Sequence, residues 1–253
     1  MTVLPGHIHS SAGAGAAPAA SFSELVHRIV QSNSGKMKPI APLESKQGGA
    51  RDWSEYKDLA EAAMAEGNYP RAEAMWLRAI AEANSFPMRD WRISYGLKSL
   101  AGLFYCLGRF EEAEIFAVRA FESTVQSYGA EHQRTADSYN FLSSIYFNLG
   151  RIDEAVGNAA RALSLYRRLD GKDSEKVAMV LYNLAVINHA LGQFETANGY
   201  YGQAYTIRAQ VLGQDHPLTA KVMRSHHELM IDRRNHEAAR RIVDRVMGQA
   251  AEF

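Results

Sequence analysis

Residues 53–253 carry apolar residues at helical spacing, and glycines interrupt this pattern at regular intervals. Before Gly150, for example, Tyr139, Leu142 and Tyr146 recur every three or four residues, which places them on one face of a helix. A second stretch with similar spacing follows this glycine. Glycine adopts a positive φ without strain and therefore often ends helices. The pattern predicts two helices joined by a short turn at Gly150.

This helix pair recurs along the chain with a period of 41 or 42 residues. The glycines that end the first helix are Gly67, Gly108, Gly150 and Gly192. Leucines precede each glycine at Leu59, Leu100, Leu142 and Leu184, and alanines follow it at Ala72, Ala113, Ala155 and Ala197. Small residues at a helix crossing allow close approach, and large residues fill the gaps beside it. One pair cannot cover both of its faces, so neighbouring pairs must stack into a solenoid.

The period divides this domain into five repeats, of which the last departs from the pattern. The repeats are expected near residues 53–93, 94–135, 136–177, 178–219 and 220–253. In the fifth, Arg234 stands in the glycine register and His226 and His227 replace the leucine and its neighbour, whereas Ala239 keeps its place. Polar residues at packing positions are expected where nothing stacks beyond, so this repeat is predicted to cap the solenoid. The histidines lack the spacing of metal ligands, and no metal site is predicted.

Residues 1–50 have a different composition. They are rich in Gly, Ala, Pro and Ser, which predicts a mostly disordered segment. Within it, Ser21 to Glu24 has the spacing of a capping box, and Phe22, Leu25 and Ile29 share one face of a short amphipathic helix near residues 22–31. A helix this short is marginal alone in water, so it needs a surface to dock on, either its own first repeat or another molecule.

Composition and charge exclude several classes of protein. The chain has 28 Lys and Arg against 28 Asp and Glu, so no overall field attracts nucleic acid or anionic membranes. Its single cysteine, Cys106, cannot form an intrachain disulfide, which fits a reducing compartment. No apolar stretch approaches the ~20 residues of a membrane span, and the N-terminus lacks the pattern of a secretory signal. We therefore expect a cytoplasmic protein with no membrane span.

Motifs of catalytic sites are missing from the sequence. The sequence contains no nucleophile elbow, phosphate-binding glycine loop or HExxH pair, and helix ends or helix packing account for its glycines. We therefore predict that the protein is not an enzyme and uses no cofactor.

Residues that recur at the same position of successive repeats form columns, and these columns resemble the tetratricopeptide repeat. The fourth copy carries the clearest match, with Tyr182-Asn183-Leu184-Ala185 in the first helix and Leu191-Gly192-Gln193-Phe194 at the turn. The period is similar to that of the longer, kinesin-light-chain-like variety. The resemblance implies an all-α, right-handed superhelical solenoid of about five helix pairs. It further implies a concave groove, lined by the first helix of each pair, that binds an extended or helical peptide of a partner protein.

Groove positions carried over from the family form two rows. The first row is Lys57, Lys98, Asn140, Tyr182 and Arg224, and the second is Met64, Tyr105, Phe147, His189 and Ile231. Glu61 follows Lys57 by four residues, so these two are expected to pair along their own helix, and Glu228 stands in the same relation to Arg224. Lys98 instead has Gly102 at that place, which leaves its ammonium without a partner and makes Lys98 with Asn140 the expected anchor.

The predicted peptide-binding residues are Lys98, Tyr105, Asn140, Phe147, Tyr182, His189 and Arg224. The family's dicarboxylate clamp needs asparagine where Glu61 and Gly102 stand, so that specificity is not expected here. The sequence favours a non-catalytic scaffold or adaptor that binds another protein. The alternative is a homo-oligomeric scaffold in which the amphipathic segment near residues 22–31 docks on a neighbouring copy.

Overall fold

The computed structural model describes residues 52–83, 85–87 and 89–250, with side chains up to residue 241. The chain divides into two units, residues 1–49 and 50–253, and all described residues belong to the second. The predictions for residues 1–50, including the amphipathic helix near 22–31, lie outside the described residues. The unit from residue 50 onward is described by itself below.

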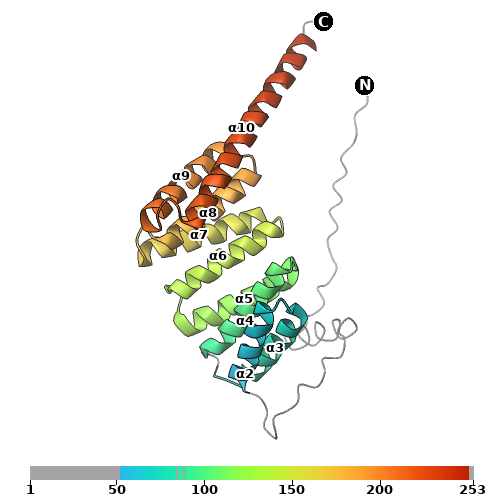
Figure 1. Cartoon of the computed structure of the whole chain (residues 1–253), viewed down its shortest axis with the longest axis vertical. Coiled ribbons are helices and arrows are strands. Elements are labelled where there is room, and N and C mark those ends of the chain that lie inside the picture. Colours follow the sequence, from blue (N-terminus) through green and yellow to red (C-terminus); the bar gives the residue numbers. More distant parts are fainter. Residues whose placement is uncertain (1–51, 84, 88, 251–253) are drawn as a thin grey trace, which may run out of the picture. The chain divides into compact units, whose positions relative to one another are not determined.

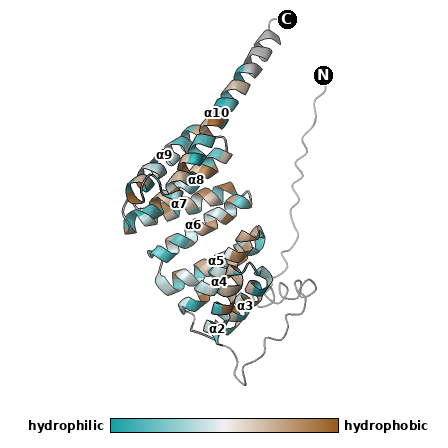
Figure 2. Ribbon diagram, viewed as in Figure 1, coloured by the Kyte–Doolittle hydropathy of each residue, from teal (hydrophilic) through white to brown (hydrophobic). Residues whose placement is uncertain are grey.

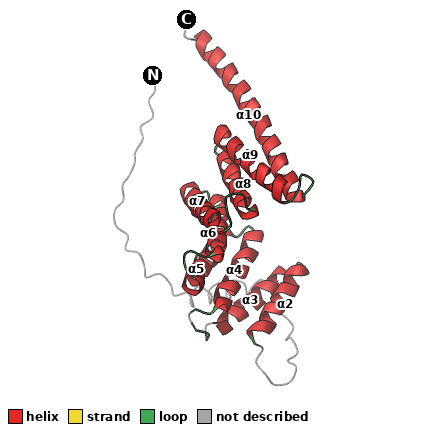
Figure 3. Ribbon diagram, turned by 90° about the vertical axis from the view of Figure 1, so that its left-hand side faces the viewer, coloured by secondary structure: helices red, strands yellow, loops and turns green. Residues whose placement is uncertain are grey.

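Every regular element of the described residues is an α-helix (Figure 3), which confirms the predicted all-α class. The first helices of the pairs, called helices A, are α2 (Trp53–Ala65), α4 (Trp91–Cys106), α6 (Gln133–Asn148) and α8 (Glu175–Ala190). The second helices, called helices B, are α3 (Tyr69–Ala83), α5 (Phe110–Tyr128), α7 (Ile152–Leu169) and α9 (Phe194–Val211). The last helix, α10 (Pro217–Ala250), begins as a helix A. The pairs follow one another in a stack (Figure 1).

The turn glycines adopt the backbone conformation that the sequence predicts. Their φ angles lie between 70° and 74° at all four predicted positions. At the third turn, the Gly150 N–H donates to the carbonyl oxygen of Phe147 at 3.0 Å, and the Arg151 N–H donates to that of Tyr146 at 2.9 Å. These bonds satisfy carbonyls at the end of α6 and reverse the chain into α7.

Alanine and apolar columns form the core between the helices. Ala155 and Ala197 are fully buried, as are their equivalents Ala72 and Ala113. In Figure 2 apolar and polar residues alternate along most helices, as expected for helices that bury one stripe and expose another. The predicted close helix crossings are therefore confirmed.

Ion pairs connect successive helices B at the turns. Arg109 donates to Glu112 of its own helix and to Glu73 of α3, the latter at 3.0 Å. Arg151, in the equivalent place, donates to Glu154 and to Glu114 of α5, the latter at 2.6 Å. The partly exposed Arg151–Glu114 pair contributes about 1 kcal/mol or less. Glu73 is buried, so its ion pair with Arg109 offsets the cost of burying a carboxylate.

The fifth repeat differs from the predicted helix pair, because α10 runs without a break from Pro217 to Ala250. Arg234 replaces the glycine that turns the chain in the other repeats, and the helix continues through it. Arg233 forms ion pairs with Glu195 of α9 at 2.8 Å and with Glu237 at 3.0 Å. The solenoid therefore consists of four helix pairs and one long helix, whose second half extends beyond the stack (Figure 1).

Candidate functional site

A hollow of about 290 Å³ lies among four helices A, and we call it the aromatic hollow. Its lining residues are Tyr105 of α4, Ser143, Ser144, Phe147 and Asn148 of α6, Tyr182, Asn183, Val186 and Ile187 of α8, and Lys221 of α10. Three of the predicted groove residues, Tyr105, Phe147 and Tyr182, come together here. They come from three successive repeats.

Neighbouring side chains hold the two tyrosines of the aromatic hollow in place. Asn148 Nδ2 donates to the Tyr105 hydroxyl at 3.2 Å, and the Tyr105 ring lies 5.7 Å from that of Phe141. The Lys221 ammonium lies 5.2 Å from the centre of the Tyr182 ring, within the range of a cation–π interaction. The hollow is therefore a preformed surface of aromatic faces beside a positive charge.

A second hollow, of about 270 Å³, lies among α4, α5 and α6, and we call it the polar hollow. Its lining residues are Ser94, Tyr95, Lys98, Ser99, Thr124, Arg134 and Ser138. Neither Lys98 nor Arg134 forms an ion pair with a described residue. The Arg134 guanidinium lies over the Tyr128 ring, 4.8 Å from its centre. Two unneutralised cations at one hollow make it suited to an anionic group.

Both hollows open on one face of α4. Lys98 and Tyr105 are separated by two helical turns, which corresponds to about 10 Å along the axis. Between them, a Cβ added to Gly102 would meet no atom within 4 Å. The open space that the sequence predicts beside Lys98 is therefore present, and it lies between the two hollows.

Asn140 and His189 form lateral bonds between helices A. Asn183 Nδ2 of α8 donates to Asn140 Oδ1 at 2.9 Å, and His189 Nε2 lies 3.0 Å from Asp232 Oδ2 of α10. The bonded pairs Tyr105–Asn148, Asn140–Asn183, Tyr182–Ser225 and His189–Asp232 are all 43 residues apart. From α4 onward, each helix A thus bonds to the next at a position one residue beyond the 42-residue period. Asn140 and His189 line neither hollow, so the expected anchor of Lys98 with Asn140 does not form within one hollow.

Of the two ion pairs predicted along a single helix, one forms. Lys57 donates to Asp58 at 2.6 Å and to Glu61 at 3.1 Å, as predicted for Glu61, and these hydrogen bonds raise the pKa of Lys57 above its usual value. The predicted pairing of Arg224 with Glu228 is wrong, because Arg224 is exposed, lines neither hollow and forms no ion pair with a described residue.

Several lining residues were not predicted from the sequence. Asn148 and Asn183 could have been found from the 43-residue offset of lateral contacts, had that offset been known. Arg134 and Lys221 give no local signal, because their positions at the hollows depend on how neighbouring repeats pack.

Acidic residues are scarce on α4, α6 and α8 although the net charge of the chain is zero. Helix α4 contains no acidic residue, and α6 and α8 contain one each, Asp137 and Glu175. Glu175 accepts from Arg208 at 3.3 Å, and Asp137 accepts from Lys176 at 3.3 Å and from the Tyr166 hydroxyl. Burial, followed by the bond to Asp137, raises the pKa of Tyr166. These two carboxylates thus have partners, whereas Lys98, Arg134 and Lys221 at the hollows form no ion pair with a residue that the structure describes.

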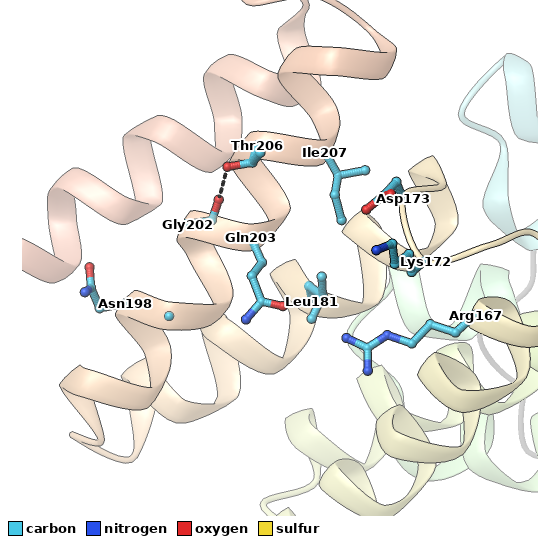
Figure 4. A pocket seen from close by; sticks show the side chains of 10 residues that line it. Arg167, Lys172, Asp173, Leu181, Asn198, Gly202, Gln203, Thr206 and Ile207 are labelled. Carbon is cyan, nitrogen blue, oxygen red and sulfur yellow. Dashed lines mark hydrogen bonds between the residues drawn. The ribbon is translucent and has the colours of Figure 1, made fainter.

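A larger hollow, of about 660 Å³, lies beside α9 and the turn after α7 (Figure 4). Its lining residues are Arg167, Lys172, Asp173, Leu181, Asn198, Gly199, Gly202, Gln203, Thr206 and Ile207. A Cβ added to Gly199 or Gly202 would meet no atom within 4 Å, so these glycines leave the hollow open. None of the predicted groove residues lines it.

The described residues also bear on metal binding and on membrane crossing. They contain no group of three or more His, Cys, Asp or Glu side chains placed to hold a metal ion. None of the helices in this part of the chain combines the length and the apolar character that crossing a membrane requires.

Comparisons with known proteins agree with the fold. The tetratricopeptide repeat family model matches residues 92–168, 134–210 and 176–250, which together span more than half of the chain. No curated protein sequence matches the chain.

Solved structures provide more distant matches. BtubC (BKLC) from P. vanneervenii is 22% identical, with a TM-score of 0.61 over 91% of this chain and 88% of that one. A putative kinesin light chain with nearly identical TPR-like repeats, from Podosopora anserina, is 18% identical, with a TM-score of 0.62 over 79% of this chain and 94% of that one. A Rap protein complexed with Competence and Sporulation Factor is 17% identical, with a TM-score of 0.60 over 91% of this chain and 59% of that one. At these identities the likeness is one of fold alone.

Proposed function

The chain belongs to the tetratricopeptide repeat family, and from this premise we propose that it is a non-catalytic adaptor that binds a peptide segment of a partner protein along its helices A. The observation that carries the proposal is the pair of hollows on one face of α4. One hollow offers unpaired cations and the other offers aromatic faces. Peptide recognition commonly combines pockets for apolar side chains with fixed polar contacts.

The distance between the two hollows indicates how far apart the two binding side chains of the peptide lie. An extended chain rises about 3.3 Å per residue, so side chains three residues apart span the ~10 Å between Lys98 and Tyr105. A carboxylate suits Lys98 and Arg134, and an apolar side chain suits the faces of Tyr105 and Phe147. We therefore expect the partner segment to carry an acidic residue about three positions from an apolar one.

One solved structure supports a ligand-binding use of this fold. The Rap protein that resembles the chain is complexed with Competence and Sporulation Factor. The fold therefore accommodates a bound molecule in at least one protein, although the shared fold does not identify the ligand of this chain.

Selection of displayed random peptides against the full chain tests the proposal. We expect acid-rich peptides, with Lys98→Ala and Phe147→Ala each weakening their binding roughly tenfold or more, because a charge-assisted bond or a buried aromatic contact is lost. Fluorescence anisotropy measures the affinity, and thermal melts show whether the variants remain folded.

Gly202→Leu is the matched control, because it fills the hollow beside α9 and leaves the helix A side unchanged. Peptides that bind both Lys98→Ala and Phe147→Ala as tightly as wild type, and lose affinity only for Gly202→Leu, would assign binding to the helix B side and contradict the proposal.

A further inference from the structure

The first half of α10 exposes the face that other helices A cover with a helix B. In α8, Leu181 is 1% exposed and Asn188 is 7% exposed. Their equivalents one repeat later, Met223 and Met230, are 57% and 44% exposed. His227, which lies between them on the same face, is also exposed. We call Met223, His227 and Met230 the open α10 face. No described residue covers it as α9 covers α8.

The second half of α10 has the register of a helix B but lies elsewhere. Ala239 occupies the column of Ala155 and Ala197, which are fully buried in α7 and α9. Every described side chain from Arg234 to Arg241 is exposed. Helices α3, α5, α7 and α9 contain 15 to 19 residues, and residues 235–250 form a helix of comparable length. Because Arg234 does not turn the chain, this segment cannot reach the open face of its own α10.

We propose that two copies of the chain associate through α10, and that residues 235–250 of each copy occupy the missing helix B place on the open α10 face of the other. A helix A and its helix B are joined by a short turn and run antiparallel, so the open face requires an antiparallel helix. A second α10 related by a twofold axis near Arg234 supplies one. Such exchange of an identical element is a common route to dimers.

Apolar and small residues near the centre of α10 suit this arrangement. In an antiparallel pair centred on Arg234, residues of the contact face that are equally distant from it in sequence lie opposite each other. The same symmetry places Met230 against Ala238, a small residue suited to a close helix contact.

Light scattering of the full chain over a range of concentrations tests the association. We expect a dimer that Met230→Glu dissociates, because the substitution places a carboxylate in the apolar contact. Met230 is 44% exposed within one chain, so the dissociated variant should remain folded, with the helix content of wild type by circular dichroism. Val156→Glu is the matched control, since Val156 is 36% exposed on α7, and it should remain dimeric. A monomeric wild type at every concentration, or a dimer that Met230→Glu does not weaken, would overturn the proposal.

Disulfide trapping tests which segment covers the open face. In a Cys106→Ser background, the pair Met230→Cys and Ala238→Cys should give a covalent dimer on mild oxidation. The pair Met223→Cys and Ala238→Cys is displaced by about 10 Å and should not, because a disulfide needs Cβ atoms ~4 Å apart. Failure of the first pair, or equal trapping by both, would show that another segment, such as residues 22–31, makes the contact. Peptide binding by helices A is measured separately and is unaffected by either result.

Discussion

At the scale of single residues, glycine performs two opposite roles in this chain. Gly150 ends α6 with a φ of 74°, a conformation that costs other residues roughly 1–2 kcal/mol. Gly157 lies within α7, where glycine is about 1 kcal/mol less favourable than alanine. A Cβ would meet no atom within 4 Å at either position, so only backbone conformation distinguishes them.

The same substitution should therefore have opposite effects at the two sites. We expect Gly150→Ala to lower the free energy of unfolding by about 1 kcal/mol or more and Gly157→Ala to raise it by up to about 1 kcal/mol. Urea denaturation followed by circular dichroism measures both. A loss of stability at Gly157 would mean that its exposed surface has a contact not seen within one chain.

At the scale of elements, the fifth repeat lacks the glycine that turns the chain in the other four. The four turns that contain glycine reverse the chain, whereas α10 passes through Arg234 as a continuous helix. The helix is also held by the ion pair of Arg233 with Glu195 and by the His236 ring, which lies 5.5 Å from that of Phe194.

Restoring a flexible residue at this position should favour the reversed chain. We expect Arg234→Gly to allow residues 235–250 to fold back onto the open α10 face, which would convert the dimer proposed above into a monomer with nearly unchanged helix content. Light scattering and circular dichroism measure the two quantities. Arg224→Gly is the control, because it also places a glycine in α10 but at a position that does not correspond to the turn glycines of the other repeats, and it should remain dimeric. A dimer that Arg234→Gly leaves intact would contradict the exchange of a helix B.

At the scale of the whole molecule, acidic and basic residues are equal in number but unevenly distributed in space. The counts of acidic and basic residues are equal, yet Lys98, Arg134 and Lys221 have no ion pair among the described residues. Binding of an acidic peptide therefore depends on a local positive field, which salt screens.

This uneven distribution of charge predicts that the affinity of the chain for an acidic peptide depends on salt. The Debye length falls from about 10 Å at 0.1 M to about 3 Å at 1 M ionic strength, so a selected acidic peptide should bind several-fold more weakly over that range. Anisotropy titrations at both ionic strengths measure the change, and Lys98→Ala should reduce it. An affinity independent of salt would indicate that the aromatic hollow alone carries the interaction.

The sequence by itself determined the helix pairs, their turns and their crossings. A turn needs a residue that tolerates a positive φ, and a close helix crossing needs small residues at helical spacing. Both requirements concern residues near one another in sequence, so the sequence alone reveals them. The resemblance to the family further proposed Tyr105, Phe147 and Tyr182 as groove residues, and these three side chains line one hollow, where their binding role stays a prediction.

Only the tertiary structure decided which of the predicted groove residues bond to a neighbouring helix and which do not. Asn140 and His189 are occupied by residues 43 positions later, and Lys221 reaches the Tyr182 ring from the next repeat. These contacts depend on the offset between stacked helices A, which follows from the packing of whole repeats and not from the spacing within one. The path of α10 was decided in the same way, because its contacts with the start of α9 connect residues that are distant in sequence.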